Sequence, residues 1–305
     1  MLCQRLYRFI PLVLVPLSCA AFSGESTAAE REKKINAVYA SVAPEVDRNY
    51  ERLGSPKSTD WRAHEQEEPQ SLEDFMYCER AKITPERFTI VLQPLGRFDA
   101  AQRKLIQDLS EYAALFFQLP VRVAGDLDLE VLDKGLNLSR LVTAGRYTRK
   151  TKYDAERILD VVLKNLVPRD AAIYIAVTNV ELDAEEQDVF GYASTTERAG
   201  LISFAGYYKA SKGAADATTR RRAFKFLNHE VGHMLGLEHC QFYRCSMNGC
   251  NNLQQADETL HYCPVCQSKL KWALEYDPKK RDAALQEFYL AQGLSKILEA
   301  KARSK

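Results

Sequence analysis

Apolar positions follow two different periods along the chain, and these periods predict its secondary structure. Short apolar runs bounded by turn residues predict buried strands, which are FTIVLQPL (88–95), VRVA (121–124), AAIYIAVTN (171–179) and LISFAGYYK (201–209). Apolar residues at helical spacing predict three longer helices, over residues 99–118, 153–166 and 218–235. The resulting order β-α-β-α-β-β-α predicts an α/β fold with a mostly parallel sheet.

The two ends of this pattern are less regular. Residues 25–85 are polar and irregular, with one helix expected over 30–50. After Gly236 the chain becomes loop-like and rich in cysteine. Asp277 and Pro278 then fit the N-cap and the first position of a last helix. The expected organisation is a signal segment (1–24), an N-terminal extension (25–85), a main domain (86–275) and a C-terminal helix (276–305).

The first thirty residues have the pattern of a secretory signal. Two arginines precede a short apolar stretch (9–17), and small residues follow at 18–21. The apolar stretch is too short to span a bilayer comfortably, although an uncleaved N-terminal anchor is the alternative. Cys19 stands where a bacterial lipoprotein carries its lipidated cysteine, but the residues before it fit that motif poorly. We therefore expect export to the periplasm or the cell exterior, with a lipid anchor at Cys19 as a further option.

The amino-acid composition limits the classes of molecule that the chain is expected to bind. The 305 residues are 46% hydrophobic, which is enough for a core, and 42 basic residues nearly balance 41 acidic ones, giving a formal charge of +1. A chain without a global electric field is not expected to bind nucleic acid or a membrane surface through its charge. An alternative function for the chain is a zinc module that binds nucleic acid or protein, and the basic run Arg220-Arg221-Arg222 would be its local support. We interpret this run instead as the solvated start of a helix.

Three of the five histidines lie within the eleven residues from His229 to His239. His229 and His233 are four residues apart, so a helix places both imidazoles on one face, away from its apolar stripe. Two imidazole nitrogens can bind one zinc ion, and Glu230 has the position of the general base in an H-E-x-x-H site. Gly236 fits a left-handed helix end that returns the chain beneath the metal, where His239 can supply a third ligand. Three protein ligands leave one position open, which is the arrangement of a catalytic zinc site.

Five of the eight cysteines lie between Cys240 and Cys266. Two pairs in this stretch have the spacing of a closed structural zinc site with four thiolates. Their members are Cys240, Cys245, Cys263 and Cys266. The alternative is two disulfides, which an exported protein would allow, but a C-x-x-C pair is a common metal hairpin and a strained disulfide loop. Cys250 is a further thiol that could be free, pair with Cys78, or compete as a ligand.

The run HEVGHMLGLEHCQFYRCSM, followed by CPVC, resembles the signature of the archaemetzincins (archaelysins), zinc metallopeptidases of the metzincin clan. The likeness covers residues 86–270. It implies a metzincin-like α/β fold with an active-site helix, a loop stapled by zinc and a C-terminal helix. It also implies two zinc ions per chain, a catalytic one on the three histidines and a structural one on the four cysteines. Met247, in a tight turn after His239, is the expected Met-turn residue that packs under the histidines.

The resemblance also implies hydrolysis of peptide bonds. A peptide or protein substrate would lie as an added strand along residues 201–208, the expected edge strand of the sheet, beside Leu201, Ser203 and Ala205. Glu230 would activate the zinc-bound water and pass its proton to the leaving amine. The sequence does not distinguish an endopeptidase from an aminopeptidase, and it leaves the oligomeric state open.

A second interpretation is a zinc-binding protein of the same fold that is catalytically weak or inactive. Such a protein would act as a peptide-binding or protein-binding module. The intact Glu230 favours the enzyme, because a general base has no structural duty at that position.

Overall fold

The computed structural model describes most of the chain that follows the expected signal segment. The described residues are 27–58, 60–64, 67–143, 149–185, 187–211, 213–250, 252–257, 259–274 and 276–294. The expected signal segment, with Cys19, therefore lies outside the described residues. Within these ranges, we find no helix with the length and apolar character that a membrane crossing requires.

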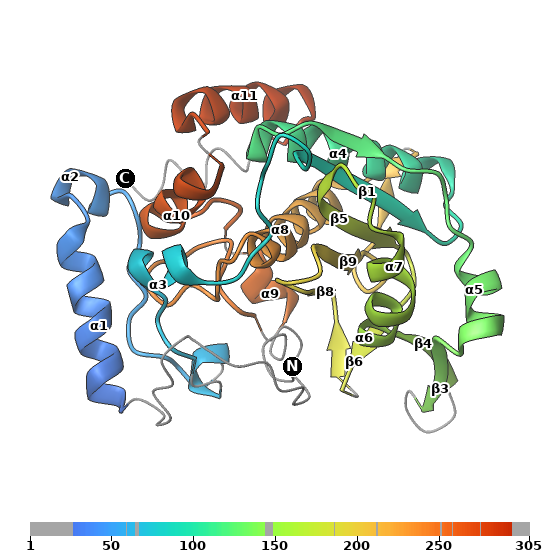
Figure 1. Ribbon diagram of the computed structural model, residues 1–305, viewed down its shortest axis with the longest axis horizontal. Coiled ribbons are helices and arrows are strands. Elements are labelled where there is room, and N and C mark those ends of the chain that lie inside the picture. The colour runs from blue at the N-terminus through green and yellow to red at the C-terminus, as the bar shows by residue number, and fades with distance from the viewer. Residues whose placement is uncertain are drawn as a thin grey trace.

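A five-stranded sheet forms the centre of the molecule (Figure 1). Its strands lie in the order β2-β1-β5-β9-β8. Their bounds are β1 Thr89–Leu95, β2 Val121–Val123, β5 Ala171–Thr178, β8 Gly191–Ala193 and β9 Ala199–Ser203. The first four strands in the sheet order are parallel, whereas β8 is antiparallel to its neighbour β9. The predicted α/β fold with a mostly parallel sheet is therefore confirmed.

Helices cover both faces of this sheet, because alternate residues of a strand point to opposite sides. In β1, Ile90 and Leu92 belong to the hydrophobic core that includes α4 (Ala100–Phe117) and α8 (Ala217–Met234). Val91 belongs to a second core on the other face. The elements of that face are α5 (Leu129–Leu136), α6 (Ala155–Ile158), a π-helical turn (Leu159–Leu163) and α7 (Lys164–Leu166).

Aspartate side chains begin three of the longer helices, as N-cap residues commonly do. Asp99 forms a capping box at the start of α4. Asp216 accepts a hydrogen bond from the Thr219 N–H (2.7 Å) at the start of α8. Asp277 caps α11 (Pro278–Ala291), so the predicted start of the C-terminal helix is confirmed. Two shorter helices of the cysteine-rich part were not predicted, namely α9 (Leu253–Ala256) and α10 (Pro264–Leu274).

The strand predicted over residues 201–209 is shorter than expected. It ends at Ser203, and the chain then turns. The Tyr207 N–H donates to the Phe204 carbonyl oxygen (3.2 Å), and both aromatic side chains are buried in the core. The apolar run 204–208 therefore reflects burial of a turn rather than continuation of the strand.

The segment before α6 is also different from the prediction. Tyr153 was expected in a helix over 153–166, but it pairs with Ser139 in a second sheet of order β3-β4-β6-β7. The helix begins only after Asp154, whose carboxylate accepts a hydrogen bond from the Arg157 N–H (2.9 Å). The strands of the smaller sheets are β3 Ser139–Thr143, β4 Arg149–Asp154, β6 Leu182–Ala184, β7 Gln187–Val189, β10 Ala210–Ser211 and β11 Ala214–Ala215.

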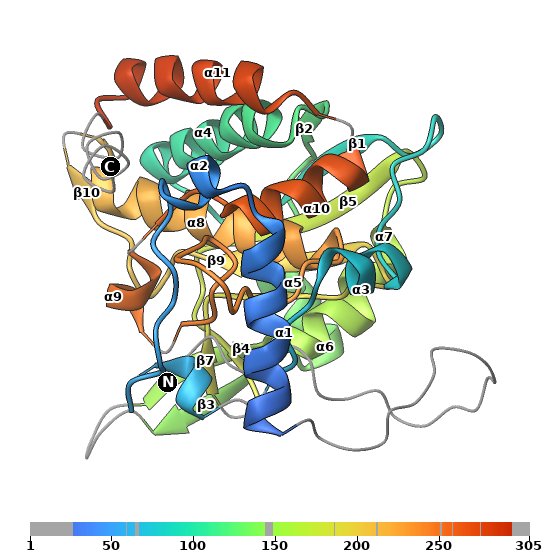
Figure 2. The same ribbon diagram turned by 90° about the vertical axis from the view of Figure 1, so that its left-hand side faces the viewer.

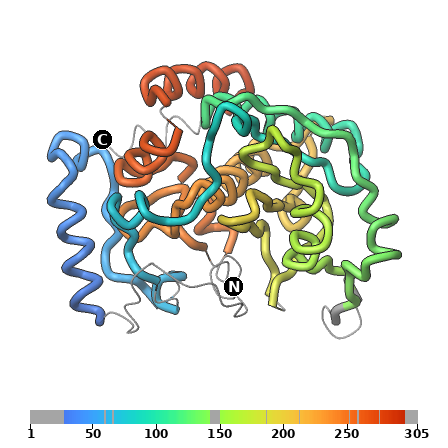
Figure 3. The backbone as a smooth tube through the Cα atoms, viewed as in Figure 1, coloured from blue at the N-terminus to red at the C-terminus, as the bar shows by residue number. Residues whose placement is uncertain are grey.

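The described residues between 27 and 85 pack against the part of the molecule that carries the cysteine-rich loop (Figures 2 and 3). They form α1 (Ala28–Ser41), α2 (Pro44–Asp47), a 3₁₀ turn (Trp61–Ala63) and α3 (Leu72–Tyr77). The Leu53 N–H donates to the carbonyl oxygen of Phe242 (2.8 Å), and the Ala81 N–H donates to that of Met234 at the end of α8 (2.8 Å). This N-terminal segment is therefore attached to the loop that follows α8.

The basic run at the start of α8 is half-buried, contrary to the expectation of a solvated helix start. Arg222 forms an ion pair with Asp257 (2.6 Å), and Arg221 donates to the Asp257 carbonyl oxygen. Arg220 donates to the side chain of Gln292 (3.0 Å). These arginines hold the first turns of α8 against neighbouring segments.

Candidate metal centre

Three histidine rings converge on one point at the end of α8. The Nε2 atom of His229 lies 3.0 Å from Nε2 of His233 and 3.2 Å from Nε2 of His239. Nitrogen ligands at zinc-binding distance and tetrahedral angles lie about 3.3 Å apart. The structure therefore brings together the three histidines singled out in the sequence, at the spacing of ligands to one metal ion.

The end of α8 explains how His239 reaches the two histidines of the helix. Gly236 has a φ of +91°, a left-handed conformation that favours glycine. The Leu237 N–H donates to the Gly232 carbonyl oxygen (2.9 Å), and the Gly236 N–H donates to that of His233 (2.8 Å), which together make a Schellman motif. The chain therefore reverses directly after α8 and returns His239 to the helix.

The second ring nitrogen of each helical histidine is held by a backbone acceptor. His229 Nδ1 lies 3.0 Å from the Ser246 carbonyl oxygen, and His233 Nδ1 lies 2.7 Å from that of Leu237. Because a carbonyl oxygen can only accept, each Nδ1 carries the hydrogen. The lone pair of each Nε2 is therefore left for a metal ion.

Burial lowers the pKa of His229 and His233 well below the ordinary histidine value, and the neighbouring histidine rings lower it further. Each residue is only 1% exposed. Both imidazoles are therefore neutral at physiological pH, which is the form that binds metal.

Glu230 lies on α8 directly after the first histidine and is 1% exposed. Its carboxylate lies against the first residue of β8, because a Cβ atom placed on Gly191 would be 2.3 Å from Glu230 Oε1. A glycine at this position allows the strand to approach the carboxylate closely. Glu230 therefore lies between the helix that carries two ligands and the terminal strand of the sheet.

Met247 packs against α8 from a tight turn. The Asn248 N–H donates to the Cys245 carbonyl oxygen (3.0 Å) and closes this turn. A Cβ atom placed on Gly232 would lie 2.4 Å from Met247 Sδ, so the methionine contacts the helix between its two histidines. The structure thus places Met247 where a Met-turn residue is expected.

A buried lysine fixes the same turn from the helix. Lys225 Nζ donates to the carbonyl oxygens of Ser246 (2.5 Å) and Cys245 (3.3 Å). The Ser246 carbonyl oxygen is also the acceptor for His229 Nδ1. The orientation of this histidine therefore depends on a carbonyl group that a charged donor holds in place.

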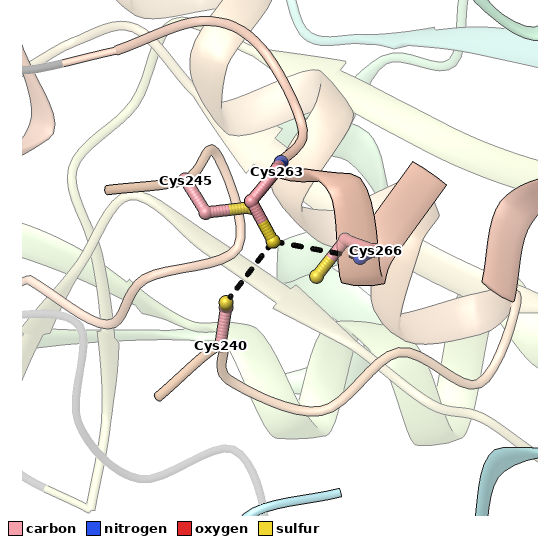
Figure 4. Close-up of side chains that lie close together, drawn as sticks. All are labelled: Cys240, Cys245, Cys263 and Cys266. Atoms are coloured by element: carbon pink, nitrogen blue, oxygen red, sulfur yellow. Dashed lines mark hydrogen bonds between the residues drawn. The ribbon is translucent and has the colours of Figure 1, made fainter. Parts of the chain in front are cut away.

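The four paired cysteines form a second group (Figure 4). It begins at Cys240, the residue directly after His239. Their Sγ atoms all lie within 4.8 Å of one another, and the Sγ atoms of Cys240 and Cys263 are 3.5 Å apart. The Cys263 N–H donates to Cys245 Sγ (3.2 Å), and the Cys266 N–H donates to Cys263 Sγ (3.5 Å). All four cysteines are free, which contradicts the alternative of two disulfides.

The chemistry of this group fits a metal ion of thiolate preference. Burial raises the pKa of Cys263 well above its ordinary value, and hydrogen bonds to the neighbouring cysteines contribute in the same direction. Cys263 therefore resists ionisation in the absence of a cation, and all four buried cysteines could bind as thiolates only if a cation compensated their charge. Zinc bound by four cysteines meets that requirement and leaves no position for water.

The two remaining described cysteines lie outside this group. Cys250 is buried, and Cys78 is half-buried with its Sγ 3.5 Å from the Gly236 carbonyl oxygen. Both are free, so pairing of Cys78 with Cys250 is wrong. The group of four does not include Cys250.

The strand predicted to receive substrate does not lie at the edge of the sheet. Leu201 lies in β9, where it is aligned with Ala176 of β5 on one side and with Tyr192 of β8 on the other. Ser203 ends this strand, and Ala205 lies beyond it. A strand with partners on both sides has no free edge for a peptide, so this prediction is wrong. The terminal strand on this side is β8.

The N-terminal segment supplies two residues of the site that the sequence interpretation missed. Glu67 Oε1 lies 2.8 Å from His239 Nδ1, and the Trp61 ring centroid lies 4.9 Å from that of His239. The glutamate and the histidine are 172 positions apart in the chain. No spacing rule connects such distant residues, so the sequence carried no signal for them.

A polar cavity of about 580 Å³ adjoins this region. Trp61 forms part of its wall, between the N-terminal segment and the loop that follows Met247. The charged residues of the lining are Glu51, Arg52, Lys57, Asp60, Arg62 and Arg244. Trp61 thus lies between this cavity and His239, and none of the three histidines lines the cavity.

Comparison with known proteins matches this chain to a peptidase family and to proteins named archaemetzincin. A family model described as Peptidase family M54 matches residues 147–272, which include both groups of ligands. Archaemetzincin-2 of Homo sapiens is 29% identical over 268 residues, covering 76% of this chain and 72% of the human protein. The archaemetzincin of Thermococcus kodakarensis is 34% identical over 105 residues, covering 33% of this chain and 56% of that protein. The crystal structure of archaemetzincin from Methanopyrus kandleri aligns with a TM-score of 0.48 at 20% identity, covering 64% of this chain and 99% of that chain.

The matched region and the signature agree. The family model covers the helix with its H-E-x-x-H motif, the third histidine and the cysteine-rich loop. The relatives matched by sequence carry the name that the signature indicates. For the matched residues 147–272, the comparisons therefore support the archaemetzincin family of zinc metallopeptidases that the signature resembles.

Proposed function

We propose that this chain is an exported zinc metallopeptidase that hydrolyses peptide bonds with Glu230 as the proton-transferring base. The main support for this proposal is the geometry of the histidine group. Three Nε2 atoms converge at separations of 3.0 and 3.2 Å beside a helix that also holds a buried carboxylate. Three neutral ligands with an adjacent carboxylate are the parts of a hydrolytic zinc centre.

The two donor sets support two zinc ions per chain. The three histidines leave a coordination position open, whereas the four cysteines close theirs. A zinc ion bound by the histidines supplies Lewis acidity, because it lowers the pKa of water and polarises a carbonyl group. The cysteine site has a structural role, because it ties the loop after α8 to the start of α10.

Glu230 carries out the proton transfers. Its carboxylate is buried and lies on the same helix as two of the ligands, so its position relative to them is fixed. It takes a proton from the attacking water as the new C–O bond forms. It then gives that proton to the amine nitrogen as the peptide C–N bond breaks.

The terminal strand β8 is the best-placed receptor for a substrate main chain. Its first residue, Gly191, passes against the Glu230 carboxylate. A peptide added along the outer side of β8 pairs its backbone with the sheet and brings a peptide bond to Glu230. The cavity beside Trp61 offers room for substrate side chains.

The pattern of the first 24 residues supports the exported location. A basic start, an apolar stretch and small residues are the parts of a secretory signal. Mass measurement of the protein recovered from outside the cytoplasm tests this proposal. The expected mass is that of a chain starting near residue 25, and an intact chain retained in the cytoplasm would contradict export.

Hydrolysis is tested by comparing the zinc-loaded protein with its Glu230→Gln variant on a diverse peptide mixture. New peptide termini are identified by mass spectrometry. The variant should keep its zinc but cleave about 10²–10⁴-fold more slowly, because it has lost the general base. Glu111→Gln, on the exposed side of α4, is the matched control and should cleave normally.

Two outcomes would contradict this proposal. Equal cleavage by the wild type and Glu230→Gln would show that Glu230 is not the base. Absence of cleavage by the wild type with both zinc ions bound would favour the binding-module interpretation.

A further inference from the structure

His239 differs from His229 and His233 in the group that lies against its Nδ1 atom. His229 and His233 donate from Nδ1 to backbone carbonyl oxygens, whereas His239 Nδ1 lies 2.8 and 3.0 Å from the two carboxylate oxygens of Glu67. The His239 side chain is 1% exposed and that of Glu67 is 22% exposed. A largely buried charged acceptor therefore faces this ligand on the side opposite Nε2.

Further contacts fix Glu67 and the ring of His239. The Gln241 side chain donates from Nε2 to the backbone carbonyl oxygen of Glu67 (2.5 Å). Trp61 lies against His239 with ring centroids 4.9 Å apart, and it is only 4% exposed. A Cβ atom on Gly249 would lie 2.5 Å from the Trp61 ring, so the indole is held between His239 and the loop after the Met-turn.

Gln70 attaches the same segment to the turn that precedes His239. Its Nε2 donates to the Gly236 carbonyl oxygen (2.9 Å), and its Oε1 accepts from the Glu238 N–H (3.3 Å). Lys269 Nζ, from α10, donates to both the backbone and side-chain oxygens of Gln70 (2.6 and 2.8 Å). Gln70 and Lys269 are 3% and 2% exposed. The turn from α8 to His239 is therefore held by the N-terminal segment as well as by its own Schellman motif.

This arrangement matters because His239 lies on a loop. A helix fixes the ring positions of His229 and His233, but the orientation of a loop side chain depends on its partners. A carboxylate that accepts from Nδ1 fixes the ring and its tautomer, and it raises the basicity of the nitrogen that binds the metal. A charged acceptor is also stronger than a neutral carbonyl group.

We propose that Glu67 is the positioning residue for the third zinc ligand. Together with Trp61 and Gln70 it forms an N-terminal clamp that completes the catalytic metal centre. The segment expected to be an extension is in this view part of the site. The proposal rests on the proposed zinc site at the three histidines, but it does not depend on hydrolysis.

The test is the zinc affinity of each site in the full chain, measured by competition with a chromophoric chelator. The variants are Glu67→Ala, which removes the acceptor, and Glu67→Gln, which keeps an acceptor oxygen without charge. Glu68→Ala is the matched control, because this neighbour is half-exposed and its ion pair at 3.9 Å is with Arg31. The cysteine site in the same molecule is an internal reference.

Glu67→Ala should weaken zinc binding at the histidine site about 10–100-fold, with the cysteine site unchanged. Glu67→Gln should recover part of this loss, and Glu68→Ala should bind as the wild type does. Cobalt substitution gives a second readout, because the visible absorption of the histidine-bound ion should change while the thiolate charge-transfer bands remain.

Two results would overturn the proposal. The first is wild-type affinity at the histidine site in Glu67→Ala. The second is an equal loss at both sites together with a lower melting temperature, which would show general destabilisation. If Glu67→Ala does not fold, Glu67→Gln decides: wild-type affinity and an unchanged cobalt spectrum in that variant would exclude a positioning role.

Discussion

At the scale of single residues, the centre is prepared for metal by the hydrogen bonds of its ligands. Backbone carbonyl oxygens hold the Nδ1 atoms of His229 and His233, and burial keeps both rings neutral. Neither ring needs to lose a proton or change its tautomer when the metal binds. The sequence identified these ligands by their spacing, but the acceptors that orient them come from the folded chain.

The contact between Gly191 and Glu230 gives a sharp prediction at this scale. Gly191→Ala introduces a Cβ atom 2.3 Å from Glu230 Oε1, so the carboxylate must move. The atoms closest to the added Cβ are Oε1, Cδ and Cγ of Glu230 and not atoms of the histidines, so zinc content should remain that of the wild type. Peptide cleavage should fall about 10²–10⁴-fold, the contribution of a general base.

Cleavage rate, zinc content and melting temperature of Gly191→Ala check this expectation. Gly54→Ala is the control, because no atom lies within 4 Å of its added Cβ. Wild-type cleavage by Gly191→Ala would show that the position of Glu230 under β8 is not required.

At the scale of elements, α8 and the loop after it carry most residues of the two candidate groups of metal ligands. The helix carries His229, Glu230 and His233, and the Schellman turn returns His239. The next residue in the chain, Cys240, already belongs to the cysteine group. The loop that carries Met247 therefore has members of the cysteine group on both sides, and His239 directly before the first of them.

Cys263→Ser tests the role of the cysteine site in this loop. The variant should lose one zinc ion per chain and melt at a much lower temperature, or remain unfolded. Structural zinc supplies about 10–16 kcal/mol in zinc-finger peptides, whereas a whole domain is stable by only about 5–15 kcal/mol. Elemental analysis and thermal unfolding measure both effects.

Cys250→Ser is the matched control for this prediction. Cys250 is also buried, but it lies outside the group of four. The Cys250→Ser variant should keep both zinc ions. Unchanged zinc content and melting temperature in Cys263→Ser would exclude the four-cysteine site.

Elements with strong periodicity could be predicted from the sequence, whereas elements decided by pairing could not. The strand over 171–179 and the helix over 99–118 appear within one residue of their predicted bounds. Tyr153 was expected in a helix because its apolar neighbours fit that period, but a hairpin partner pairs with it. The place of Leu201 in the sheet depends on β8, a three-residue strand too short to leave a pattern.

At the scale of the whole molecule, the site depends on parts that are far apart in the chain. The N-terminal segment reaches His239 through Glu67 and Trp61, and the terminal strand reaches Glu230 through Gly191. The sequence motif contains every proposed metal ligand but none of these contacts. Motif spacing is local, whereas the supporting residues are brought together only by the tertiary fold.

The sheet order also determines how a substrate can reach the centre. β8 ends the order β2-β1-β5-β9-β8 on the side of Glu230, so the outer side of β8 is where the proposed added strand would pair. The N-terminal segment and the loop after the Met-turn enclose the polar cavity of about 580 Å³. In the proposed function, the molecule would thus combine a main-chain receptor at β8 with a separate space for side chains.

The most direct test of this account is to locate zinc in crystals of the zinc-loaded full chain by anomalous scattering at the zinc absorption edge. We predict two peaks, one bound by the Nε2 atoms of His229, His233 and His239 and one bound by the four sulfur atoms of the cysteine group. The first ion should keep an open position next to Glu230, and the second should have none. A single peak, or a disulfide within the cysteine group, would contradict the proposal of one open and one closed zinc site in this chain.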